Sequence, residues 1–167
     1  MFYSRQPRHR KRICFWRCIT CGRRVGSFDC NKAEVDAKAV DGTTSLISAT
    51  VFGHRDVVEL LLANKAAVSA KTNDGMTPLH AAADKGYKDI AALLLASHAD
   101  VSARDKIGLT PLHYAAGYGH MDVAVLLLDN KADINATDFQ GATPLRLAVY
   151  ENHEDIAEML RQHRGHE

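Results

Sequence analysis

Apolar residues in the middle of the chain fall into two short groups, and each group predicts a helix. Leu79, Ala82 and Ala83 share one side of a short helix, because residues three and four positions apart lie on one helix face. In the second group, Ile90 and the leucines 93–95 form an apolar face wider than a single contact could bury. Such a helix needs neighbours on both sides, which predicts a stack of similar units.

Polar residues and glycine mark where these two helices begin and end. Thr77 suits the cap position before the first helix, because its hydroxyl can accept from unpaired backbone N–H groups. Pro78 fits the first helical position, and Gly86 fits the turn that follows. Asp89 is expected to open the second helix, where a carboxylate suits the positive end of the helix dipole. The segment is therefore predicted to be a helix–turn–helix unit.

This unit returns every 33 residues. The tetrapeptide Thr-Pro-Leu-His begins at Thr77 and at Thr110, and it is altered to Thr-Pro-Leu-Arg at Thr143 and to Thr-Ser-Leu-Ile at Thr44. This period and tetrapeptide are those of ankyrin repeats, and residues 39–167 resemble that family. The resemblance implies an all-α solenoid of stacked helix–turn–helix units, joined by β-hairpin-like loops.

The resemblance divides this region into four repeats and a partial leading one. Residues 31–38 begin with the Asn-Lys-Ala triplet that also occurs at 64–66 and 130–132. We therefore interpret them as the tail of a preceding repeat whose helices are not recognisable in the sequence. The full repeats are expected at residues 39–71, 72–104, 105–137 and 138–167.

The last repeat differs from the others in its second helix. Arg161 stands where the other repeats have leucine, and Glu158, Gln162 and His163 make the same helix polar. Terminal repeats need a polar outer face for solubility, so this composition predicts a C-terminal cap.

The turn after each second helix also departs from the family, which usually places glycine there. The corresponding residues here are Lys65, His98, Lys131 and Arg164. A residue other than glycine in the left-handed conformation costs about 1 kcal/mol. These turns are therefore expected to reduce the stability of the stack without changing its fold.

The first 30 residues differ from the repeats in charge. They carry eight basic residues and one acidic residue, a net +7, whereas residues 31–167 carry 13 basic and 19 acidic residues, a net −6. We expect residues 1–30 to be a disordered basic segment. The compact cluster Arg8–Arg12 leaves two alternatives open, a nuclear-import signal and a nucleic-acid patch. The second candidate function is accordingly a nucleic-acid-associated regulator whose repeats recruit partners.

All four cysteines lie in the same segment, at Cys14, Cys18, Cys21 and Cys30. They are weak candidates for a zinc site, because zinc sites usually combine two closely spaced pairs and Cys30 stands alone. We therefore expect no metal and no cofactor. The repeats have no cysteine, which favours an intracellular, cytoplasmic protein, and no apolar run is long enough to predict a membrane span.

The histidines do not form a recognisable catalytic pattern. His80 and His113 belong to the tetrapeptide, and the ankyrin resemblance implies that they brace the hairpin loops by hydrogen bonds. No nucleophile–base pairing, phosphate-binding glycine loop or zinc-protease motif occurs. The chain is therefore expected to be neither an enzyme nor a binder of a small-molecule substrate.

The positions that vary between repeats indicate the binding surface. In ankyrin repeats, hairpin tips and inner-helix ends form a concave face that contacts partners, so we expect another protein to bind there. Aromatic residues at such centres often dominate the binding energy; the alternative is that they only pack between adjacent hairpins. The predicted partner-binding residues are Phe52, Met76, Lys85, Lys106, Ile107, Leu109, Tyr118, Phe139, Gln140 and Tyr150. Five of them are expected to lie close together: Phe139, Tyr118, Tyr150, Ile107 and Leu109. The predicted function is a non-catalytic scaffold, adaptor or inhibitor.

Overall fold

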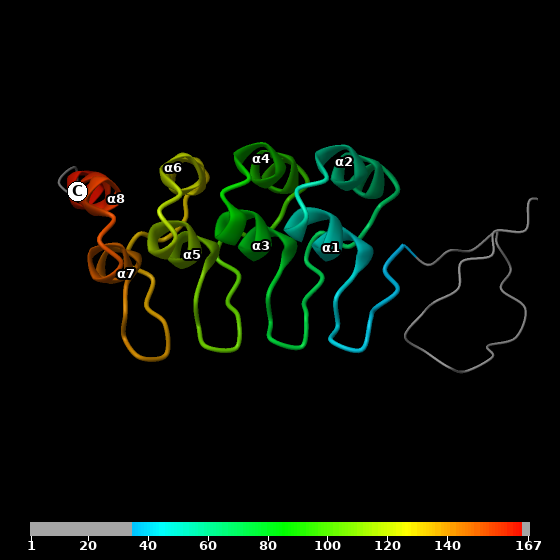
Figure 1. The fold of residues 1–167 in the computed structure, drawn as a ribbon, viewed down its shortest axis with the longest axis horizontal. Coiled ribbons are helices and arrows are strands. Elements are labelled where there is room, and N and C mark those ends of the chain that lie inside the picture. Colours follow the sequence, from blue (N-terminus) through cyan, green and yellow to red (C-terminus); the bar gives the residue numbers. More distant parts are fainter. Residues whose placement is uncertain (1–34, 165–167) are drawn as a thin grey trace, which may run out of the picture. The chain divides into compact units, whose positions relative to one another are not determined.

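The computed structural model describes residues 35–164, which form eight α-helices in one compact unit (Figure 1). One layer contains α1, α3, α5 and α7 side by side, and the second contains α2, α4, α6 and α8. The loops between successive pairs project from the first layer. No strand occurs in this range, as an all-α solenoid requires. The bounds are α1 Ser45–Val51, α2 Arg55–Ala63, α3 Pro78–Lys85, α4 Lys88–Ala96, α5 Pro111–Gly117, α6 Met121–Asp129, α7 Pro144–Tyr150 and α8 Glu154–Arg164.

The inner helices begin as the sequence predicts. Thr77 has an extended backbone (φ −98°, ψ 167°), and its Oγ1 accepts from the His80 N–H at 3.4 Å. Pro78 occupies the first helical position of α3, where its missing N–H costs no hydrogen bond. The second helix of this pair begins one residue earlier than predicted. It begins at Lys88, and Asp89 lies within its first turn.

The core lies between the two layers and continues from one helix pair to the next. Leucine from each inner helix and leucine from the outer helices fill it, while alanine lets neighbouring helices approach closely. Because each pair buries its apolar side against the pairs on either side, the helices are stable only as a stack. Fully buried members include Leu46, Leu79, Leu94, Leu112, Leu127, Leu160, Ala82, Ala91, Ala115 and Ala124.

Three of the four predicted left-handed turns are present. Lys65, His98 and Lys131 have φ of 63°, 64° and 66°. The prediction was wrong for Arg164, which is the last residue of α8 rather than a turn after it. The other outer helices stop at the position of Gln162, whereas α8 continues for two more residues, and there His163 Nδ1 lies 2.9 Å from Met159 O, one turn back in the same helix.

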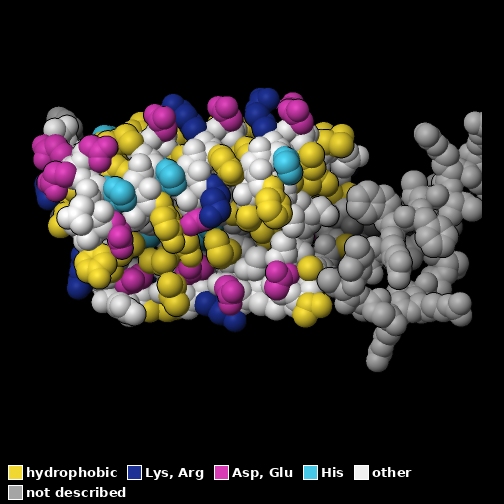
Figure 2. All heavy atoms as spheres, in the orientation of Figure 1, with side chains coloured by type: hydrophobic (Ala, Val, Ile, Leu, Met, Phe, Trp, Pro, Cys, Tyr) yellow, Lys and Arg dark blue, Asp and Glu magenta, His cyan; other side chains and the backbone are white. Residues whose placement is uncertain are grey.

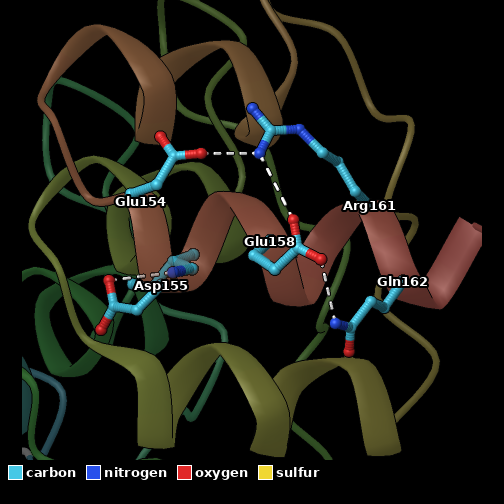
Figure 3. Close-up of polar contacts among 6 residues, drawn as sticks. Glu154, Asp155, Glu158, Arg161 and Gln162 are labelled. Carbon is cyan, nitrogen blue, oxygen red and sulfur yellow. Dashed lines mark hydrogen bonds and ion pairs between the residues drawn. The ribbon is translucent and has the colours of Figure 1, made fainter.

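Polar contacts cover the outer side of α8 (Figure 3). Arg161 Nη1 lies 2.8 Å from Glu154 Oε1 and 3.6 Å from Glu158 Oε2. Arg161 corresponds to Leu128 in the preceding outer helix, which packs against the core around α8. This side of α8 is therefore charged where the other outer helices carry leucine.

The described chain begins with the segment interpreted as the tail of a leading repeat. Asp36 Oδ1 accepts a hydrogen bond from the Ala67 N–H at 2.8 Å. Ala67 lies in the corresponding segment of the next unit, two residues before Ser69, the counterpart of Asp36, so the two segments are in contact. Residues 31–34 lie outside the described range.

Candidate functional site

The aromatic residues selected from the sequence lie at the surface of the unit. Phe52, Tyr118, Phe139 and Tyr150 are exposed by 70%, 58%, 72% and 78%, and Ile107 by 58%. These values are high for large apolar side chains and indicate a surface available to a partner. Among the other predicted residues, Lys85, Lys106 and Gln140 are exposed, and Met76 and Leu109 are half-buried.

Backbone hydrogen bonds join the hairpin tips to one another. The Lys106 N–H donates to Asp74 O at 2.9 Å, and the Phe139 N–H donates to Ile107 O at 3.1 Å. The Phe139 ring also lies against Gly108, since a Cβ on that glycine would be 2.8 Å from Phe139 Cδ1. Ile107 and Phe139 are thus neighbours, as predicted. Phe139 packs against the preceding hairpin, as the alternative interpretation expected, and its side chain nevertheless remains largely exposed.

Tyr118 does not stand alone on α5. Its ring stacks on Tyr114 with centroids 6.2 Å apart, and Tyr114 meets His80 edge to face at 5.6 Å. The Tyr114 hydroxyl donates to Asp105 Oδ2 at 2.8 Å. Burial, followed by this bond to Asp105, raises the pKa of Tyr114 above its ordinary value, so the hydroxyl keeps its proton and remains a donor. The hydrogen bond to Asp105 therefore fixes the orientation of the Tyr114 ring, and the Tyr118 ring stacks on it.

Tyr150 and Gln140 lie farther along the same surface, in an open hollow of about 650 Å³ at α7. Leu147 and Arg146 also line this hollow. The sequence predicts that Tyr150 lies close to Tyr118 and Phe139. In the structure Tyr150 lines one hollow with Gln140, the residue that follows Phe139 in the chain.

Two histidines hold the hairpins in place and are not free for chemistry. His80 Nε2 lies 3.1 Å from Leu109 O, and His113 Nε2 lies 3.1 Å from Ala142 O, each in the following hairpin. On the other side of its ring, His80 Nδ1 accepts from the Thr77 N–H at 3.2 Å. Burial lowers the pKa of both imidazoles. Neutral rings that donate from Nε2 satisfy this geometry, which is the bracing role implied by the tetrapeptide.

Charged residues surround the apolar ones without forming strong pairs. Lys85 Nζ lies 2.9 Å from Asp84 Oδ2, and Lys106 Nζ lies 3.9 Å from Asp74 Oδ1, with both lysines largely exposed. Such surface pairs contribute little energy. In Figure 2, hydrophobic side chains form an interrupted band between a row of charged residues over the outer helices and a row of charged hairpin tips.

The described part of the chain was also compared with the requirements of a metal site and of a membrane span. Residues 35–164 contain no group of three or more His, Cys, Asp or Glu side chains that could hold a metal ion. No helix in this range is long and apolar enough to cross a membrane. The cysteines Cys14, Cys18, Cys21 and Cys30 and the basic cluster Arg8–Arg12 lie outside the described residues.

The helix pairs, their 33-residue period and the histidine braces agree with the comparison to known families. A family model of ankyrin repeats (three copies) matches residues 19–105 and 97–167. The chain belongs to the ankyrin repeat family. No curated protein matches it. The family match starts before residue 39, where the periodic tetrapeptides led us to place the first full repeat.

Ankyrin repeats are generally protein–protein interaction modules, so membership indicates the class of ligand but not the partner. Tyr114 lies on this surface but is not among the residues predicted from the sequence, because its position in the repeat resembles a core position of the inner helix. Comparing corresponding positions could have found it, since Ser48, Ala81, Tyr114 and Leu147 occupy the same place in the four repeats. The large differences in size among these residues distinguish the surface from one repeat to the next.

Proposed function

We propose that the chain is a non-catalytic scaffold, adaptor or inhibitor that binds another protein through the concave face of the ankyrin stack. The observation that carries this proposal is the exposure of large apolar side chains along the hairpin tips and inner-helix ends. Phe52, Ile107, Tyr118, Phe139 and Tyr150 are each more than half exposed. Exposed apolar clusters of this kind usually serve binding.

The scaffold beneath these side chains also supports the proposal. Neighbouring hairpins are joined by backbone bonds, and histidine braces link each of two inner helices to the next hairpin. A surface held in this way loses little conformational entropy when a partner binds, so more of the contact energy appears as affinity.

The test compares purified variants in binding a partner captured from the native source. Truncating an aromatic hot spot typically costs about 2 kcal/mol or more, roughly thirtyfold in affinity. Phe139→Ala and Tyr118→Ala are therefore expected to weaken binding by about thirtyfold or more, with no loss of helical circular dichroism. Removal of residues 1–30 is expected to leave binding intact.

Two further variants serve as controls. Lys85→Ala is expected to cost much less than the aromatic variants, because an exposed rim charge contributes little. Val125→Ala removes an exposed apolar side chain from the outer helix α6 and should have no effect. Aromatic variants that bind like wild type, together with loss of binding on removal of residues 1–30, would overturn the proposal and assign binding to the basic segment.

A further inference from the structure

A second, smaller hollow lies between the first and second repeats on the same surface. Its volume is about 300 Å³, and its lining comes from α1, α3 and the two hairpins that precede them. The walls include Ile47 and Phe52 from the first repeat and Thr72 and Met76 from the second. This hollow is large enough for one long side chain and open enough to receive it from solvent.

The next junction along the stack shows why the hollow exists. Ala81, which lines it, corresponds to Tyr114 one repeat later. The Tyr114 ring meets His80 and binds Asp105, and the corresponding residues Ile47 and Thr72 line the hollow. The space that a tyrosine ring fills between the second and third repeats is therefore left open between the first and second.

The charge of the hollow is negative. Asp41 and Asp74 both line it, and none of its lining residues is basic. Asp41 Oδ1 accepts from the Thr43 N–H at 2.9 Å, which orients the carboxylate and lowers its pKa. The cation nearest Asp74 is Lys106 at 3.9 Å, in an exposed pair of little strength. Two carboxylates thus stand beside an apolar wall with no strong cationic partner among the described residues.

We propose that this hollow binds an arginine side chain in an extended segment of the partner protein, between Asp41 and Asp74 and against Phe52. A guanidinium matches carboxylates in charge and in planar geometry, and it stacks on aromatic rings. The aliphatic part of the arginine would pack on Met76. This inference rests on the proposed function, because it names the chemistry of a partner bound to the concave face.

The test starts from a phage-displayed library of random peptides selected on the full chain. Selected peptides are expected to contain an arginine beside apolar residues. Replacing that arginine with neutral citrulline should weaken binding by about tenfold or more in isothermal titration, since a charge-assisted contact is lost. The charge variant Asp41→Asn with Asp74→Asn should cause a similar loss and reduce the salt dependence of the affinity.

Two more variants distinguish the effect of the carboxylate charges from the effect of the open volume of the hollow. Ala81→Tyr is expected to fill the hollow as Tyr114 fills the next junction and to block the same peptides; circular dichroism checks its fold. Asp100→Asn is the matched control, because Asp100 makes the same turn contact as Asp41, to the Ser102 N–H at 2.9 Å, but does not line the hollow. This control should bind like wild type.

The outcomes distinguish this inference from the proposed function. The arginine site would be overturned by peptides that contain no cation, bind the Asp41→Asn, Asp74→Asn variant as tightly as wild type, and bind Tyr118→Ala more weakly. The proposal that partners bind the concave face would then still hold. Peptides that depend on none of Asp41, Asp74, Tyr118 and Phe139 would overturn both proposals.

Discussion

Individual residues of this chain carry backbone strain that a substitution can relieve. Lys131 has φ 66° and follows α6, in a turn where a Cβ is disfavoured. Lys131→Gly is expected to raise the free energy of unfolding by about 0.5–1 kcal/mol, because relief of left-handed strain outweighs the added entropy of the unfolded chain. Urea denaturation measures the change.

Alanine at the same position provides the control for Lys131→Gly. Lys131→Ala keeps the Cβ and removes the rest of an exposed side chain, so it should leave stability nearly unchanged. A lower urea midpoint for the glycine variant than for wild type would contradict this expectation. It would show that the relief of backbone strain is smaller than the cost of the added conformational entropy of the unfolded chain.

The buried histidine braces make stability depend on pH. His80 and His113 are fully buried, and burial lowers the pKa of each below its ordinary value near 6.5. Asp105 and Lys71 act on His80, and Asp138 and Arg104 act on His113, without reversing this direction. The unfolded chain therefore binds protons more readily than the folded chain as the pH falls below about 6.5.

We expect the free energy of unfolding to be insensitive to these two groups above about pH 6.5 and to decrease on acidification. The slope from each histidine is at most about 1.4 kcal/mol per pH unit. Urea titrations between pH 7.5 and 5 provide the measurement, at roughly half-unit steps. The double variant His80→Gln with His113→Gln should be less stable at neutral pH and show a shallower slope; an equal slope would contradict the assignment.

At the scale of the helix pairs, glycine allows neighbouring hairpins to approach closely. Gly108 (φ 88°) faces the next hairpin, and a Cβ there would lie 2.9 Å from the backbone nitrogen of Phe139. Gly141 (φ 77°) occupies the same position one repeat later, and a Cβ there would meet nothing within 4 Å. Both glycines therefore have a left-handed backbone, but only Gly108 is packed closely against the next hairpin.

Alanine substitutions at these two glycines separate the two effects. Gly141→Ala should cost about 1 kcal/mol from left-handed strain alone. Gly108→Ala should cost a further 1–3 kcal/mol or so, because the hairpins must move apart. Equal losses of the free energy of unfolding, measured by urea denaturation, would mean that the hairpins separate without cost.

The sequence predicted most of the elements because its period is regular. Thr77, Pro78 and Gly86 mark helix boundaries through local backbone chemistry, which needs no knowledge of the rest of the fold. The same reasoning was wrong at Arg164, because α8 continues through His163, whose side chain contacts Met159 O one turn back. It also could not predict that Asn152 would take the left-handed position held by glycine in the earlier repeats, with φ 62°.

The candidate surface was predictable only in part. Repeat alignment identified exposed residues such as Phe139, because hairpin tips lie outside the core in every repeat. The hollow beside Ala81 was not predicted, because it depends on the size difference between Ala81 and Tyr114 and on Asp41 and Asp74 lining one space. Such features arise from contacts between repeats, which the pattern within a single repeat does not contain.

At the scale of the whole stack, the two ends of the described unit differ in character. Met121 and Leu128 on α6 pack against the core formed around α8. The corresponding residues of α8 are Glu154 and Arg161, which pair with each other at 2.8 Å. At the opposite end, Val57 is 45% exposed, although its counterparts in later repeats are buried. We infer that the polar side of α8 prevents one molecule from continuing the stack of another.

The variant Glu154→Met with Arg161→Leu gives α8 the side chains of α6 and tests this inference. Its new apolar side should pack against the exposed Val57 and Leu60 end of a second copy, in a head-to-tail contact that does not close. We expect its sedimentation coefficient to rise with concentration more steeply than that of wild type. Ala92→Val on α4 is the control, because Ala92 is exposed, corresponds to Val125 and makes no contact with Arg161 or Glu154. Identical sedimentation of wild type and double variant would show that the Arg161–Glu154 pair does not keep the stacks apart.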